Sequence, residues 1–497
     1  MFNLKELGEP TEFWEYFEKI SKIPRCSEHE EKVRIFIKKE AEDLGYITKV
    51  DKAGNLLIKI PAKSHPYLKG VLQCHMDMVC EKNVGVTHDF YKDPLKLLIK
   101  DLKGEKWLTA EGTTLGADNG VGISYLLTLM KKIHKGELDF DPLSLDLLFT
   151  VNEEQGLSGA FEIQEDFTDG DFLVNIDSEE DNAVTIGCAG GIVTFYEVKI
   201  EKTKVEETFI PIKIFISGLL GGHSGVDINL GRGNAIKIIG QILWKLNKNF
   251  NIQICSIEGG NRTNAIPREA SSIFYIKKDK FSEIKSFIET QKRNIKIIFE
   301  EIEPNLEISI KKLENYPEKK ALLKKVQDKI LNIIYLIPFG PLSMHPQIKG
   351  LVFTSTNLGA IKTRDFDIEI KLSQRSLSEY FKTVIWERVK ALFDLSNLDF
   401  NFKIDSDYPG WIPNFKSKLL AKCSETYKDL FNEKMVIKAI HAGLECGILK
   451  KKFPQMDMIA IGPINEASHS PDERLLIKSV EKVWKFIISL LKNLSKD

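Results

Sequence analysis

Hydrophobic positions in the first 190 residues alternate between helical spacing and short continuous runs. Apolar residues recur at helical spacing from Thr11 to Ile23 and from Glu28 to Leu44, where Ser27 is a candidate N-cap. Four further runs have the length and composition of strands: NLLIKI from Asn55, GVLQCHMDMVC from Gly70, LSLDLLFTV from Leu143 and DFLVNID from Asp171. An amphipathic helix is predicted between the second and third runs, at about residues 121–133. This alternation predicts an α/β sandwich with a mostly parallel sheet.

The pattern changes after residue 190, where strand-like runs dominate. They read IVTFYEVKI, FIPIKIFIS, SSIFYIKK, IKIIFEEI and LEISIKK. Helical spacing is found at Asn234–Leu246, Glu318–Ile334, Lys416–Leu430 and Leu475–Leu494. We therefore expect one α/β domain, made of residues 1–190 and 408–497, to be interrupted by an α+β domain of residues 191–407.

The composition is that of an ordinary folded protein. Hydrophobic residues make up 43% and charged residues 28% of the 497 positions, which excludes a disordered chain, a collagen-like fibre and a small disulfide scaffold. Because 70 basic residues balance 71 acidic ones, nucleic acid is not an expected partner. No apolar run reaches the roughly 18–20 residues that span a membrane, and the N-terminus lacks a signal-peptide pattern.

Seven widely spaced cysteines without a CxxC pair favour free thiols in a reducing compartment. The chain is therefore expected to be cytoplasmic, with no membrane partner.

Polar side chains follow the predicted strands of the first domain. His75 and Asp77 lie in an apolar run and face the same way, because strand side chains alternate. Taken alone, they could simply bond to each other. Glu153 and Glu154 follow the next strand and could be an exposed pair, whereas Asp177 ends the run LVNID.

Two further candidates lie in loops. Asp118, in TTLGADNGVG, could be a turn or helix-capping residue. His469 lies in SHSPDE, before the C-terminal helix, and the alternative there is that this stretch serves only to cap the helix through the neighbouring Ser470. Imidazole and carboxylate ligands suit Zn²⁺, with Mn²⁺ or Co²⁺ as substitutes. Two metals held ~3.5–4 Å apart need a bridging carboxylate, which Asp118 could supply. Together, the six side chains at strand ends and loops predict a metal centre.

Several stretches resemble the cytosolic aminoacyl-histidine dipeptidases, a family of dinuclear metallopeptidases of the M20 clan. They include QCHMDMVCEK, TTLGADNGVG, VNEEQGLSGA, LVNIDSEE, GLLGGHSGVDI, NAIPREA, HAGLECG and IGPINEASHSPDE. The resemblance covers nearly the whole chain. It implies a peptidase domain with two divalent metal ions, interrupted by a lid and dimerisation domain, and a homodimer.

The resemblance also implies a role for each candidate. Asp118 would bridge both metals, with His75 and Asp177 completing one site and Glu154 and His469 the other. Glu153 would be the general base that activates a metal-bridging water. Asp77 would hydrogen-bond the His75 imidazole and fix its tautomer.

In the inserted domain, the resemblance implies that His223 of GGHSG stabilises the oxyanion, in its own or the partner subunit. Arg375 of SQRSLSE and Asn261 of GGNRTNAIP would grip the substrate's C-terminal carboxylate. Gly443 of HAGLECG would line the cleft, together with His441 and Glu445. Without the resemblance, His223 could be an ordinary loop histidine and Arg375 a solvated strand charge.

The expected function is hydrolysis of Xaa-His dipeptides, including carnosine-like ones. The alternatives are a broader dipeptidase, a tripeptidase or an N-acyl amino acid deacylase of the same clan, and a non-catalytic peptide-binding protein on the same fold. A phosphodiesterase is disfavoured because no phosphate-binding GxxxxGK[ST] loop occurs.

Overall fold

The computed structural model describes residues 7–314 and 316–496, which form two compact units. Unit 1 comprises Met1–Cys188, Trp411–Ala439 and Leu444–Asp497, and unit 2 comprises Ala189–Gly410 and Ile440–Gly443. The tetrapeptide Ile440–Gly443 belongs to unit 2, although it lies within the range 408–497 expected for the α/β domain. A four-residue stretch carries too short a pattern to show which core it joins.

An eight-stranded sheet forms the centre of unit 1, in the order β1-β2-β6-β3-β7-β21-β8-β20. The strands are β1 Ile47–Val50, β2 Leu56–Ile60, β3 Leu68–His75, β6 Leu143–Thr150, β7 Phe172–Ile176, β8 Ala183–Cys188, β20 Val436–Ile440 and β21 Asp457–Ile461. The central strands β6, β3, β7 and β21 run parallel. The pairs β1–β2, β2–β6 and β21–β8 are antiparallel. The predicted α/β class is confirmed, with a mixed sheet whose core is parallel.

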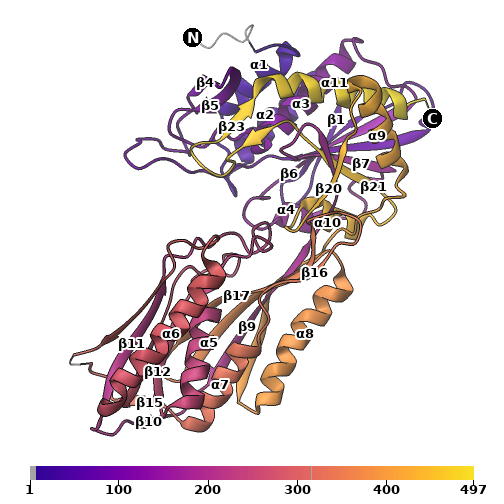
Figure 1. The fold of residues 1–497 in the computed structure, drawn as a ribbon. Helices are drawn as coiled ribbons and strands as arrows, with labels where there is room; N and C mark the ends of the chain where they lie inside the picture. The colour runs from indigo at the N-terminus through magenta and orange to yellow at the C-terminus, as the bar shows by residue number, and fades with distance from the viewer. Residues whose placement is uncertain (1–6, 315, 497) are drawn as a thin grey trace. The chain divides into compact units, whose positions relative to one another are not determined.

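The helices of unit 1 pack around this sheet (Figure 1). They are α1 Thr11–Ser21, α2 Glu31–Asp43, α3 Ala117–His134, α4 Ser158–Glu162, α9 Lys418–Phe431, α10 Glu445–Lys452 and α11 Ile477–Leu494. The prediction that α3 is amphipathic is wrong, because it is buried on nearly every face as far as Met130. Tyr125 of α3 packs against Phe13 of α1 and Trp484 of α11, and Gly122 lies against Cys74 of β3.

A small antiparallel sheet of unit 1 has the order β22-β23-β5-β4. Its strands are β4 Leu97–Leu102, β5 Glu105–Ala110, β22 Asn465–Glu466 and β23 Arg474–Leu476. Residues 467–473, between β22 and β23, carry His469 and Glu473. The sheet thereby fixes both ends of the late loop that contains a predicted metal ligand.

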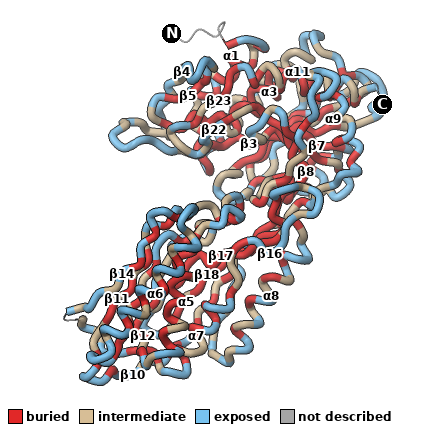
Figure 2. The backbone as a smooth tube through the Cα atoms, viewed as in Figure 1, coloured by how far each residue is buried: buried red, intermediate tan, exposed pale blue. Residues whose placement is uncertain are grey.

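Unit 2 is built on a nine-stranded antiparallel sheet with the order β14-β11-β13-β12-β17-β18-β9-β19, and β16 pairs with β17. The strands are β9 Gly190–Lys199, β11 Phe209–Ser217, β12 Gln253–Gly259, β13 Ala270–Lys277, β14 Glu307–Lys312, β16 Gly340–Met344, β17 Val352–Thr363, β18 Asp367–Ser376 and β19 Phe400–Tyr408. Short strands β10 Lys202–Lys204 and β15 Lys320–Leu322 pair separately. Helices α5 Ala235–Asn249, α6 Phe281–Phe299, α7 Lys324–Leu336 and α8 Glu379–Ser396 lie along one face of the large sheet (Figure 1). Figure 2 shows buried residues along the strands of this sheet and along α5.

The run IKIIFEEI, predicted as a strand, begins within helix α6. Ile284, Ile288 and Ile295 recur at helical spacing on its buried face, whereas Ile297 and Ile298 are 72% exposed. The apolar run therefore combines one buried helical position with two solvent-facing ones, which a short window cannot distinguish from a strand.

The expectation of free thiols throughout is wrong for two cysteines. Cys26 and Cys80 form a disulfide across a sequence separation of 54 residues, and the other five are free and buried. Residue Cys26 bridges to Met78 as a short parallel pairing, which brings the two cysteines together. No spacing pattern predicts such a contact.

No helix among the described residues is long and apolar enough to cross a membrane.

Candidate metal centre

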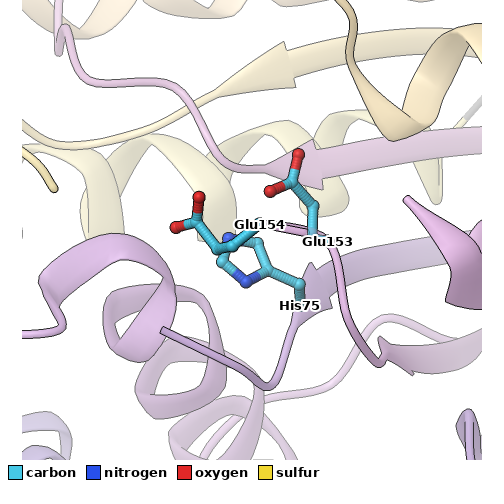
Figure 3. Close-up of side chains that lie close together, drawn as sticks. All are labelled: His75, Glu153 and Glu154. Carbon is cyan, nitrogen blue, oxygen red and sulfur yellow. The ribbon is translucent and has the colours of Figure 1, made fainter. Parts of the chain in front are cut away.

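The predicted acids and imidazoles of unit 1 gather at one edge of the eight-stranded sheet. His75 is the last residue of β3, Asp177 directly follows β7, and Glu153 and Glu154 lie in the turn after β6. These three strands are parallel neighbours, so their carboxyl ends meet at the same edge. Figure 3 shows His75, Glu153 and Glu154 close together there.

Asp118 lies where the backbone departs from helical geometry at the start of α3, next to a cis peptide bond with Asn119. Its two carboxylate oxygens face different partners. Oδ1 lies 2.9 Å from Nε2 of His75, and Oδ2 lies 3.2 Å from Nε2 of His469. One carboxylate therefore connects two imidazoles that are far apart in the sequence.

Each imidazole has a second carboxylate of its own. Nε2 of His75 lies 3.3 Å from Oδ1 of Asp177, and Nε2 of His469 lies 3.0 Å from Oε2 of Glu154. The result is three overlapping groups of potential ligands, each within 4.8 Å: His75–Asp118–Asp177, Asp118–Glu154–His469 and His75–Glu153–Glu154. The first two share Asp118, as expected for two adjacent cation sites.

The charge of this cluster fits a pair of divalent cations. Burial, and then the neighbouring Asp118 carboxylate, raises the pKa of Asp177; burial, opposed by His469, raises that of Glu154. Burial disfavours a charged His75, yet the facing carboxylates raise its pKa well above the ordinary value. Three carboxylates thus crowd the Nε2 atoms of two imidazoles, and Oε1 of Glu154 is buried without a hydrogen-bond partner. Oxygen and imidazole donors of this kind suit Zn²⁺ or Mn²⁺.

Asp77 holds the strand end and the acidic turn together. Its Oδ1 lies 3.3 Å from Nδ1 of His75 and accepts the backbone N–H of Glu153 at 3.0 Å. Oδ2 accepts the backbone N–H of Glu154 at 3.2 Å and the Ser27 hydroxyl at 2.8 Å. The sequence suggested that Ser27 caps α2. This prediction is wrong, because the N-cap residue of α2 is Glu30. The hydroxyl instead helps Asp77 to position His75, Glu153 and Glu154.

Sequence reasoning missed the two groups that hold the Asp118 loop. The buried Glu473 carboxylate accepts backbone N–H groups of Leu115 at 2.7 Å, Gly116 at 2.8 Å and Asp118 at 3.1 Å. The buried Arg25 donates to the carbonyls of Asp77, at 2.8 Å, and Gly116. The acid of the HSPDE stretch was a visible signal for Glu473, whereas nothing in IPRCSE distinguished Arg25. The alternative role of Ser470 as a helix cap is excluded, because α11 begins at Ile477 and its N-cap residue is Leu476. The Ser470 hydroxyl stays within its own loop, where it donates to the Ala467 carbonyl and accepts the N–H of Asp472.

Glu153 lies beside a second buried polar layer. Burial, opposed by His75, and then the charges of Asp177 and Glu154 raise the pKa of Glu153 well above its ordinary value. Glu445, at the start of α10, accepts the Gln73 amide at 2.6 Å and the Thr150 hydroxyl at 2.8 Å. Gln73 precedes His75 by two positions on β3 and so faces the same side of the sheet. Glu445 therefore contacts β3 and β6 close to their carboxyl ends. Mainly because it is buried, its pKa is raised to about 7.

Unit 2 carries the other predicted side chains. His223 accepts the backbone N–H groups of Gly225 and Val226 at Nδ1, each at 3.2 Å. Its neutral ring therefore carries the proton on Nε2. Burial, and then the Arg375 charge, lowers the pKa of His223 to about 4. The ring is thus an uncharged donor at neutral pH.

The remaining predicted residues of unit 2 have different surroundings. Arg375 is only 6% exposed, which excludes the alternative of a solvated strand charge. Gly443 lies against the ring of Tyr408. Asn261 is exposed in a hollow of about 580 Å³, together with Arg262 and Arg268. Neither Arg375 nor His223 is among the described residues that line that hollow.

Comparison with known proteins agrees with this arrangement. A model of the peptidase dimerisation domain of the M20 family matches residues 216–303, within unit 2. The cytosol non-specific dipeptidase of Escherichia coli (strain K12) is 36% identical over 498 residues, which cover 99% of each chain. The chain belongs to the dipeptidases of the M20 peptidase family.

A solved structure supports the same membership in this M20 family. The aminoacylhistidine dipeptidase from Vibrio alginolyticus is 33% identical in sequence and superimposes with a TM-score of 0.87. The match covers 99% of this chain and 98% of the Vibrio alginolyticus chain. A tripeptidase from Staphylococcus aureus, at 16% identity, full coverage of both chains and a TM-score of 0.57, shares the fold. This M20 dipeptidase is accordingly a hydrolase of peptide bonds.

Proposed function

We propose that this M20 dipeptidase hydrolyses dipeptides with a free C-terminal carboxylate and prefers Xaa-His substrates, including carnosine-like ones. The observation that carries the proposal is the divided Asp118 carboxylate, whose two oxygens face the His75 and the His469 group separately. The histidine preference is supported by the name of the Vibrio alginolyticus relative, an aminoacylhistidine dipeptidase.

The proposed cofactor is a pair of divalent metal ions, Zn²⁺ foremost, with Mn²⁺ or Co²⁺ as substitutes. His75, Asp177 and Asp118 would hold one ion, and Glu154, His469 and Asp118 the other. When bound, such a pair polarises the substrate carbonyl and lowers the pKa of water. The unmatched negative charge of the cluster supports this assignment.

Glu153 is the proposed general base. Its backbone N–H is fixed by Asp77. Its carboxylate lies close to His75 and Glu154, but it belongs to neither of the two groups that share Asp118. The carboxylate takes a proton from the attacking water and passes it to the leaving amine. The raised pKa of Glu153 suits a group that must both accept and release a proton.

Two side chains of unit 2 have proposed roles toward the substrate. The Nε2–H of the neutral His223 ring donates to the oxyanion of the tetrahedral intermediate, in its own or the partner subunit. Arg375 binds the C-terminal carboxylate through its guanidinium fork. Arg375 is almost fully buried, and no ion pair with a carboxylate is found for it among the described residues. A buried cation of this kind calls for an anionic ligand.

The proposed assembly is a homodimer, and the proposed compartment is the cytoplasm. The match to a peptidase dimerisation domain supports the first. The name of the Escherichia coli relative supports the second. The Cys26–Cys80 disulfide removes the argument from free thiols.

A substrate panel tests the proposed function. The metal-loaded enzyme would be compared on an Xaa-His dipeptide, a dipeptide without histidine, a tripeptide and an N-acyl amino acid. We expect turnover of both dipeptides, with the higher kcat/KM for Xaa-His. A higher kcat/KM for the tripeptide or the acyl amino acid would favour the corresponding alternative, and no turnover of any compound would favour a peptide-binding protein.

A further inference from the structure

We propose that Tyr408 is a positioning residue that aims the guanidinium of Arg375 at the C-terminal carboxylate of the substrate. The proposal rests on the function given above, in which Arg375 binds that carboxylate. Tyr408 itself is assigned no contact with the substrate. Its hydroxyl accepts a hydrogen bond from Nη1 of Arg375 at 2.6 Å.

The two side chains come from strands that are not neighbours. Strand β9 lies between β18, which carries Arg375, and β19, which ends at Tyr408. In the register of the sheet, Arg375 and Tyr408 both pair with Gly191 of β9. A side chain on the central strand at this level would therefore separate them.

Gly191 leaves the space that the tyrosine ring occupies. A Cβ atom at this position would lie 2.3 Å from the Tyr408 hydroxyl oxygen and 2.4 Å from its Cζ atom. The ring thus crosses directly over the Gly191 backbone to reach Arg375. Glycine is required here for the close approach and not for an unusual backbone angle, because Gly191 is not among the glycines with positive φ.

Gly443 makes room for the same ring from another part of unit 2. A Cβ atom there would lie 2.8 Å from Cε2 of Tyr408. This contact gives Gly443, which the sequence placed in the substrate cleft, a packing role. Two glycines from separate segments therefore accommodate one aromatic side chain.

The backbone of Tyr408 is also held in place. The buried Lys382 of α8 donates to the Tyr408 carbonyl at 2.8 Å and to the Asp407 carboxylate at 2.6 Å. Two residues later, the N–H of Gly410 donates to Glu379 at 2.9 Å. The hydroxyl therefore projects from a fixed base, as a positioning group must.

Arg375 retains donors for a ligand. The tyrosine hydroxyl occupies Nη1, whereas the buried Nε atom has no hydrogen-bond partner. The neighbouring imidazoles do not compete as cations, because burial and the Arg375 charge lower the pKa of His223 to about 4 and that of His441 to about 3. A guanidinium fixed at one nitrogen can present a remaining edge to a carboxylate in a single orientation.

The test compares Tyr408→Phe with the wild-type holoenzyme on one dipeptide and on its C-terminal amide. Phenylalanine keeps the ring over Gly191 and removes only the hydroxyl. We expect KM for the free acid to rise roughly 10-fold, from the lost hydrogen bond to a charged group, with kcat changed less than about twofold. Because the amide offers no carboxylate, its kcat/KM should not change. Metal content and melting temperature should equal those of the wild type.

Two further variants complete the experiment. Tyr380→Phe removes a hydroxyl from a tyrosine of α8 that is 71% exposed, and should change neither substrate's kinetics. Arg375→Ala should abolish the preference for the acid over the amide, and adding Tyr408→Phe to it should cause no further loss.

The outcomes separate the inference from the function on which it rests. If Arg375→Ala abolishes the preference but Tyr408→Phe leaves it intact, Tyr408 does not position Arg375 and the inference is overturned. If Arg375→Ala also leaves the preference intact, the assigned role of Arg375 is wrong and the inference fails with it. An equal loss on acid and amide in Tyr408→Phe would likewise overturn the inference, by indicating a general structural role.

Discussion

The polar cluster of unit 1 carries an excess of negative charge, whereas that of unit 2 carries a positive charge. At the strand ends of unit 1, three carboxylates surround two imidazoles: Asp118, Glu154 and Asp177. The charge of Asp118 raises the pKa of both Glu154 and Asp177, so a bound cation would stabilise their charged forms. In unit 2, the buried Arg375 has neutral imidazoles beside it and no carboxylate partner among the described residues. The first cluster is therefore suited to bind cations and the second to bind an anion. A dipeptidase needs both, because the metal pair and the substrate carboxylate carry opposite charges.

Replacing Asp118 by asparagine should have the largest effect, because the variant lacks the charge that both groups of unit 1 share. We expect a near-complete loss of activity and less than one equivalent of bound metal per chain, measured by elemental analysis after dialysis. Asp177→Asn, the matched control, should lose metal from one site only. Equal metal loss in both variants would contradict the shared role of Asp118.

Glu153→Gln distinguishes the base from the ligands within the same cluster. The amide cannot accept a proton, so kcat should fall by roughly 10²–10⁴-fold. Metal content should stay near that of the wild type, since the groups that share Asp118 do not include Glu153. Retention of activity, or loss of metal together with activity, would show that Glu153 has another role.

The neutral imidazole of unit 2 can be tested by His223→Ala. Removal of one oxyanion donor is expected to lower kcat by roughly 10²–10³-fold, with KM and metal content little changed. His345→Ala, a substitution at another histidine of unit 2, is the control and should leave kcat unchanged. An equal loss of kcat in both variants would indicate a general disturbance of unit 2.

The smallest effect concerns stability at acid pH. Burial lowers the pKa of His441 to about 3, so below its ordinary value of 6.5 the unfolded chain takes up a proton that the folded chain refuses. This histidine therefore destabilises the fold progressively as pH falls from about 6.5 toward 3. His441→Asn should show a smaller drop in melting temperature between pH 7 and pH 4.5 than the wild type does. An identical drop would mean that His441 is not held neutral in the folded chain.

The sequence was most informative where one local rule decides the structure. Alternation along the apolar run from Gly70 predicted that His75 and Asp77 face the same way, although β3 itself ends at His75. The carboxyl ends of parallel strands placed Asp177 and the Glu153–Glu154 turn at one edge. Asp118 and His469 were candidates as loop residues with ligand chemistry, and the family resemblance then implied which metal each would hold. The structure brings all seven side chains together.

Contacts between distant segments could not be predicted in this way. Glu473 holds the Asp118 loop across more than 350 residues of sequence, and Arg25 reaches the same loop from the N-terminal region. The Cys26–Cys80 disulfide depends on a bridge to Met78 that no spacing reveals. The Tyr408–Arg375 bond likewise requires the strand order that places Gly191 between them. These features follow from tertiary topology, which local patterns do not encode.

The most direct test of the paired cation site is a crystal structure of the zinc-loaded enzyme with anomalous diffraction measured on both sides of the zinc absorption edge. The account predicts two anomalous peaks per chain, one beside each oxygen of Asp118, contacting His75 and Asp177 on one side and Glu154 and His469 on the other. A single peak, or two peaks of which one does not contact Asp118, would contradict it.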